Sequence, residues 1–194
     1  MNIRPYYLWI SLIIIPSLAT AQQYQLKNDM VRSGRVRYFP NGKRNVIIDT
    51  DSAKQLLLDP DQVLWFEKGR FRFEPVSNFT VHVKRGESLH VTHDFAIVQD
   101  TGAVCLLVHD LLISPELSSR SYLLRRRGEK KLIVIHDNSN EFDDGNFSSH
   151  DQKLLLKVFS NNPNLRQLLR QQNLTCRNLP EYVRHYNRQV NSVR

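Results

Sequence analysis

The sequence predicts a mainly β protein with a helical C-terminal tail, an α+β chain in which an antiparallel small barrel or sandwich precedes two or three short helices. From Tyr24 to about His136, short apolar runs alternate with polar residues at a spacing of roughly ten residues, and glycines fall in the polar breaks. After an acidic, turn-forming stretch, apolar residues recur at helical spacing. We therefore expect an antiparallel β domain over residues 22–136, an acidic linker over 137–148 and a helical segment over 149–194.

Residues 1–21 have the pattern of a signal peptide. Arg4 supplies the positive start, an apolar run extends from Tyr7 to Leu18, and Ala19-Thr20-Ala21 forms a small-x-small cleavage site. An uncleaved membrane anchor is the alternative, but the run is shorter than the ~20 residues needed to span a bilayer and Pro16 interrupts it. We expect a soluble mature chain without a transmembrane segment, exported to the periplasm, the extracellular space or the cell surface.

Two hairpins are predicted in the first half of the β domain. A strand over residues 31–39 ends at Pro40-Asn41-Gly42-Lys43, where Asn-Gly tolerates the positive φ of a tight turn, and residues 45–49 return. The second predicted hairpin consists of residues 62–66 and 70–73, with its turn at Gly69. In the last of these strands the arginines and the phenylalanines face opposite sides, because successive side chains alternate across a strand.

The helical segment carries three start signals. Residues 149–152, Ser-His-Asp-Gln, have the form of a capping box, and four apolar residues then follow at helical spacing. Asn161-Asn162-Pro163 ends this helix and begins a second, and Asn178-Leu179-Pro180 begins a third. Helices this short are not stable alone, so they are expected to pack on the sheet or on one another.

The net charge and the position of the basic residues indicate which kinds of partner to expect. The 194 residues carry a net charge of +8, and removing Arg4 with the signal leaves +7. Basic residues surround two predicted hairpin tips; the candidate anion-binding set is Arg125, Arg126, Arg127, Lys130 and Lys131, and the second group is Arg32, Arg35, Arg37, Lys43 and Arg44. Outside the cytoplasm, envelope components such as anionic glycans or lipid headgroups fit these tips better than nucleic acid. The alternative is a solvated surface that protects sheet edges.

Cys105 and Cys176 are the only cysteines, and two interpretations stay open. In an oxidising compartment they could form a disulfide. Alternatively, Cys105 is a small buried apolar residue in its strand and Cys176 stays free.

No catalytic, cofactor-binding or metal-binding residues are predicted. Four His-Asp dipeptides start at His93, His109, His136 and His150, but Asp commonly ends strands and caps helices. The pair His90 and His93 is only half of a zinc site. A hydrolase would need convergent carboxylates or a Ser-His pair in a cleft, for which Asp94, His109 and Asp110 are candidates that the sequence alone does not place.

The C-terminal region resembles a family of exported proteins of Gram-negative bacteria that has no assigned function. The resemblance is carried by residues 158–165, Val-Phe-Ser-Asn-Asn-Pro-Asn-Leu, and residues 179–187, Leu-Pro-Glu-Tyr-Val-Arg-His-Tyr-Asn. The resemblance implies export from the cytoplasm and an overall architecture, but no activity. The resulting hypothesis is an exported, non-enzymatic binding or structural module of the cell envelope. The alternatives are a hydrolase of an envelope polymer and a binder of anionic glycans or lipid headgroups through the basic tips.

Overall fold

The computed structural model describes residues 22–27, 29–38, 46–49, 55–83, 87–112, 118–139, 143–171 and 173–192. The predicted signal peptide, the turn at residues 40–43 and the basic residues Lys43 and Arg44 lie outside them. Within these ranges, an antiparallel sheet of ten strands in the order β10-β9-β8-β7-β6-β5-β1-β2-β3-β4 is followed by three helices. The predicted antiparallel β fold with a helical C-terminal tail is confirmed. None of the helices in the described ranges has the length and apolar character needed to cross a membrane.

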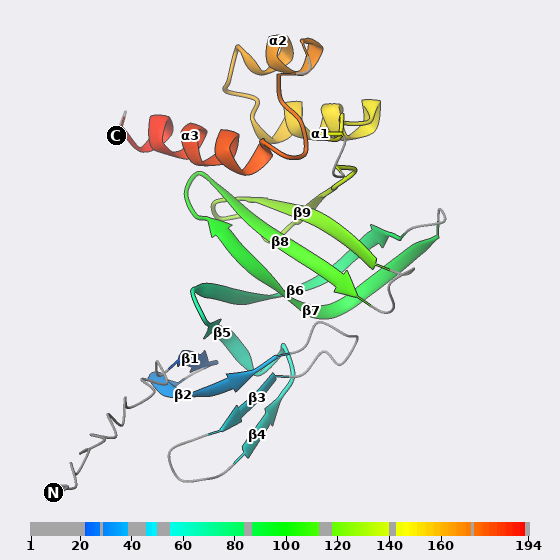
Figure 1. Cartoon of the computed structure of the whole chain (residues 1–194). Helices are drawn as coiled ribbons and strands as arrows, with labels where there is room; N and C mark the ends of the chain where they lie inside the picture. The colour runs from blue at the N-terminus through cyan, green and yellow to red at the C-terminus, as the bar shows by residue number, and fades with distance from the viewer. Residues whose placement is uncertain are drawn as a thin grey trace, which may run out of the picture.

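The strands lie between Gln22 and His136, and the helices follow from Ser149 (Figure 1). The strands are β1 (Gln22–Leu26), β2 (Val31–Arg37), β3 (Val46–Asp49), β4 (Gln55–Leu58), β5 (Val63–Lys68), β6 (Phe71–His82), β7 (Ser88–Asp100), β8 (Val104–Leu112), β9 (Ser118–Arg126) and β10 (Ile133–His136). The helices are α1 (Ser149–Val158), α2 (Leu165–Arg170) and α3 (Leu179–Ser192).

The first five strands and the start of β6 form a lobe around an aromatic core, drawn in the lower part of Figure 1. Alternate residues point into this core, as the period of two in a strand requires. The buried members of the aromatic core are Tyr24, Val36, Tyr38, Val46, Ile48, Leu58, Val63, Phe66, Phe73 and Phe95.

The second lobe has three layers. The later part of β6 lies against β9 and β10, and an inner core that includes Val81, Val91 and Leu107 fills the space between them. The helices cover the opposite face of β8, β9 and β10, over a helix-side core that includes Leu106 and Leu124 (Figure 1). Because the two faces of β8 are covered from both sides, six consecutive residues, 104–109, are buried.

Side-chain hydrogen bonds fix the helices on the sheet. The Arg126 guanidinium on β9 donates to the carbonyls of Lys157 and Val158 at the C-terminal end of α1. Buried Asn187 on α3 accepts from the Val104 N–H at 2.9 Å and donates to the Val104 carbonyl at 2.7 Å. A Cβ at Gly102 would lie 2.5 Å from Asn187 Cγ, so this turn requires glycine.

The N-terminal cap of α1 lies one residue before the predicted position. Ser148, not Ser149, is the cap residue, and its hydroxyl oxygen accepts from the Asp151 N–H at 3.1 Å. The same hydroxyl donates to the Asp151 carboxylate at 2.7 Å, so Ser148 and Asp151 are joined by two hydrogen bonds at the start of the helix.

The two lobes meet where β7 and β8 diverge. Their backbone ladder pairs only Ile97–Asp100 with Leu106–Val108. On the N-terminal side of Ile97, β7 remains paired with β6. On the C-terminal side of Val108, β8 remains paired with β9. The divergence leaves a gap in the ladder between the lobes, and the candidate site lies there.

Candidate ligand-binding site

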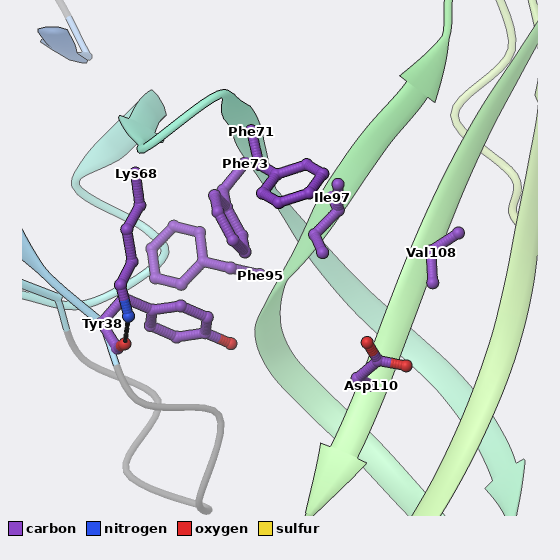
Figure 2. A pocket seen from close by; sticks show the side chains of 8 residues that line it. All are labelled: Tyr38, Lys68, Phe71, Phe73, Phe95, Ile97, Val108 and Asp110. Carbon is purple, nitrogen blue, oxygen red and sulfur yellow. Dashed lines mark hydrogen bonds between the residues drawn. The ribbon is translucent and has the colours of Figure 1, made fainter. Parts of the chain in front are cut away.

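A cavity of about 240 Å³ lies between the two lobes, at the point where β7 and β8 diverge (Figure 2). We call it the aromatic cavity; it is lined by Tyr38, Lys68, Phe71, Phe73, Phe95, Ile97, Val108 and Asp110. Four of its walls are aromatic rings and two are branched aliphatic chains, so it is an apolar hollow with polar groups at its ends. Small-molecule sites commonly have this composition.

Tyr38 forms one wall of the cavity because three rings of the aromatic core hold it edge-on. Its ring centroid lies 5.5 Å from that of Phe66, 5.3 Å from that of Phe73 and 5.5 Å from that of Phe95. Edge-to-face pairs of this kind contribute about 0.5–1.5 kcal/mol each beyond burial. The Lys68 ammonium donates to the Tyr38 carbonyl at 2.6 Å, which fixes the backbone as well.

A buried polar network fixes the hydroxyl of the same tyrosine. Tyr38 donates to Asp94 Oδ1 at 3.0 Å, and the Phe95 N–H donates to the same oxygen at 2.8 Å. His109 Nε2 lies 3.0 Å from Asp94 Oδ2. Because a carboxylate only accepts, Nε2 carries the proton of this bond. Asp94 and His109 are 7% and 1% exposed, so the bond across the gap between β7 and β8 is buried.

The pKa shifts follow from this geometry. Burial would raise the pKa of Asp94, but the hydrogen bond and charge of His109, together with the Phe95 N–H and the Tyr38 hydroxyl, hold it below its usual value. Burial and the neighbouring Asp94 carboxylate raise the pKa of Tyr38 far above its usual value. The phenol therefore stays protonated at neutral pH and serves as a hydrogen-bond donor, not as a base or a nucleophile.

Ser121 and His136 continue the polar row from His109 across β9 and β10. Ser121 is the register partner of both histidines, so the three side chains share one face of the sheet. His109 Nδ1, Ser121 Oγ and His136 Nδ1 are buried and have no hydrogen-bond partner among the described residues. The His136 ring lies 4.2 Å from that of His82, centroid to centroid, at the surface end of the row.

The row contains Ser, His and Asp side chains, but their setting does not suit a hydrolase. Catalysis would require the Ser121 hydroxyl to contact substrate and to be hydrogen-bonded to a base. Ser121 is fully buried, and the Phe79 ring packs edge-on against His109 with a centroid distance of 5.0 Å. The arrangement therefore fixes β7, β8 and Tyr38 relative to one another.

The structure separates the five predicted anion-binding residues. Arg125 faces the inner side of the sheet and lies 3.4 Å from a Glu74 carboxylate oxygen, whereas Arg126 caps α1. Arg127, Lys130 and Lys131 are exposed at the turn between β9 and β10. Adjacent arginines on a strand point to opposite faces, so the cluster in the sequence is not one surface in the fold.

The disulfide between Cys105 and Cys176 is not formed. Both thiols are free and buried. Cys105 packs in the inner core with Leu107, whereas Cys176 packs in the helix-side core with Leu106 on the other side of the sheet. The sheet itself separates the two sulfurs, and the alternative of free, buried cysteines describes them correctly.

Two of the four His-Asp dipeptides contribute to the candidate site. Asp94 joins His109 of the next dipeptide, and Asp110 lines the cavity while accepting from Arg120 at 2.7 and 3.2 Å. Asp151 is part of the α1 cap. Within the described ranges, no three His, Cys, Asp or Glu side chains are grouped so that they could hold a metal ion.

No family model, curated protein or solved structure matches the chain. The site is therefore interpreted from its own geometry.

Proposed function

We propose that the protein is an exported, non-enzymatic binding module that takes the apolar part of a small ligand into the aromatic cavity. The observation that carries this proposal is an aromatic hollow of about 240 Å³ at the strand divergence, in which Tyr38 is fixed by the buried Asp94–His109 pair. A wall that is already fixed loses little conformational freedom when a ligand binds, which favours affinity. Asp94 and His109 are 7% and 1% exposed, so neither side chain is placed to act on a bound molecule.

A neutral fluorescent probe, N-phenyl-1-naphthylamine, tests the cavity. We expect saturable binding to the purified mature protein at one site. Phe71 lines the cavity and is 39% exposed, so Phe71→Ala removes a contact without opening the core. The affinity should fall about tenfold, which corresponds to ~1.4 kcal/mol.

The matched control is Leu57→Ala, which removes an exposed apolar side chain from the edge strand β4, outside the cavity. This variant should bind the probe as the wild type does. Equal loss in both variants, or no loss in either, would contradict the assignment of the cavity as the binding site.

Export rests on the sequence of residues 1–21 and is part of the same proposal. Fractionation of expressing cells and the intact mass of the product test it. A chain that begins near Gln22 in the periplasmic or secreted fraction supports export, and an uncleaved cytoplasmic chain excludes it.

A further inference from the structure

A second hollow follows the aromatic cavity along β8 and shares Asp110 with it. This polar cleft has a volume of about 670 Å³ and is lined by His82, Val83, Asp110, Leu111, Leu112, Ser119, Arg120, His136, Asp137, Asn138 and Ser139. Val108 and Asp110 line the first hollow, and Asp110, Leu111 and Leu112 line the second, so the two hollows meet at Asp110 on β8.

The charged groups of the polar cleft are already engaged by neighbouring side chains. Asp110 and Arg120 form a two-bond ion pair with N–O distances of 2.7 and 3.2 Å. The Asp137 carboxylate accepts from the backbone N–H of Ser139 at 3.0 Å and from its hydroxyl at 2.5 Å. A charged ligand group would have to compete with one of these partners, whereas a neutral hydroxyl could add to them as donor and acceptor.

The lysine, arginine and aspartate side chains that line the two hollows comprise two cations and two anions. Lys68 lies at the aromatic end, Arg120 and Asp110 lie at the junction, and Asp137 lies in the cleft. An anionic head placed in the cleft would approach the carboxylates of Asp110 and Asp137, and a cationic head would approach the Arg120 guanidinium. Side chains that both donate and accept, such as Asn138 and Ser139, suit a head with several hydroxyl groups.

We propose that the aromatic cavity and the polar cleft form one elongated site for a neutral amphiphile, with its apolar end in the cavity and a hydroxyl-rich head in the cleft. This inference rests on the proposed function and adds the class of ligand to it. The smaller hollow takes an alkyl or aryl group, and the larger hollow, in which polar side chains lie among Val83, Leu111 and Leu112, takes a head of sugar size.

Three probes with eight-carbon chains test the head preference by calorimetry, each below its micelle concentration: octyl glucoside, octanoate and octyltrimethylammonium. We expect octyl glucoside to bind at least tenfold more tightly than either charged probe. Phe71→Ala should weaken all three by a similar factor, because it alters the tail site. Asn138→Ala, at an exposed residue of the cleft, should weaken octyl glucoside alone, by about fivefold.

The outcomes separate this inference from the proposed function. Equal affinities for the three probes, with a loss in Phe71→Ala, would retain the aromatic cavity and overturn the neutral head. A preference for octanoate or for the ammonium probe would overturn it as well. If octyl glucoside binds and Phe71→Ala has no effect, or if no octyl probe binds, the proposed function fails too. Leu57→Ala again serves as the control for an exposed apolar residue elsewhere.

Discussion

Replacing His109 with leucine removes one of three donors to a carboxylate that is 7% exposed. Asp94 accepts from Tyr38 at 3.0 Å, from the Phe95 N–H at 2.8 Å and from His109 at 3.0 Å. Removing one partner of a buried ion pair costs about 3–5 kcal/mol. Because two donors remain, we expect the lower end, about 3 kcal/mol. For a domain of this size, that corresponds to a fall in Tm of about 6–12 °C.

The loss of stability in His109→Leu should also depend on pH, because the pKa of Asp94 is lowered in the wild-type fold and raised in the fold of the variant. In the wild type this pKa lies below its unfolded value, so the carboxylate stabilises the fold above about pH 4, and this contribution is lost as the pH falls through the folded pKa. In His109→Leu, burial dominates and the carboxyl takes up a proton more readily in the folded state. Acid therefore stabilises the variant relative to the wild type, and the difference in unfolding free energy should shrink between pH 7 and pH 4.

Urea unfolding followed by circular dichroism at several pH values measures both effects. His90→Leu is the matched control, because His90 is exposed on β7 and should change stability by less than about 0.5 kcal/mol. A stability of His109→Leu within that margin of the wild type, or a difference that stays constant with pH, would refute the role assigned to the Asp94–His109 bond.

Three further predictions follow from the same structure. Arg126→Ala should cost about 1–2 kcal/mol in urea unfolding because it uncaps α1, whereas Lys131→Ala should cost less than about 0.5 kcal/mol; equal effects would contradict the separate roles of the basic residues. Burial raises the pKa of the Cys105 thiol, and burial also raises the pKa of the Cys176 thiol, to about 11. A thiol reagent should therefore label both only after unfolding, and an intact mass showing a disulfide would contradict the structure. Burial, together with the nearby His82 and His150, lowers the pKa of His136 in the fold. The contribution of His136 to stability is therefore present above about pH 6.5 and is lost as the pH falls through the folded pKa. His136→Asn should flatten this part of the pH–stability curve, and an unchanged slope would contradict the prediction.

The alternation of residue types made the strands and helices predictable. In residues 70–73 the arginines and phenylalanines were expected on opposite faces, and the structure places the Arg72 guanidinium 4.4 Å from the Trp65 ring centroid, while Phe73 is buried in the aromatic core. Pro180 lies in the first turn of α3, where proline fits a helix. Pro163 does not occupy the predicted first position of α2, because the helix begins at Leu165 after the cap residue Asn164.

The candidate site was not predictable in the same way, because it depends on pairing between distant strands. Asp94 and His109 are both candidates in the sequence, but their contact requires β7 and β8 to diverge on the N-terminal side of Ile97, which no local pattern in the sequence specifies. Two features of the sequence do bear on this arrangement. The carboxylate of Asp94 precedes an apolar run, which indicates a buried position, and the period of two already places Arg125 and Arg126 on opposite faces.

The position of the site follows from how the sheet is divided between two cores. A sheet that bends to cover the aromatic core on one side and the helix-side core on the other must diverge between them, and β7 and β8 lose their backbone pairing at Ile97 and Val108. A divergence left open would expose apolar surface, and one filled by side chains would leave no cavity. The Asp94–His109 bond restores a link between the strands on one face, while the rings around Tyr38 leave the other face hollow. A ligand that binds in this hollow and not to the unfolded chain would stabilise the fold by mass action.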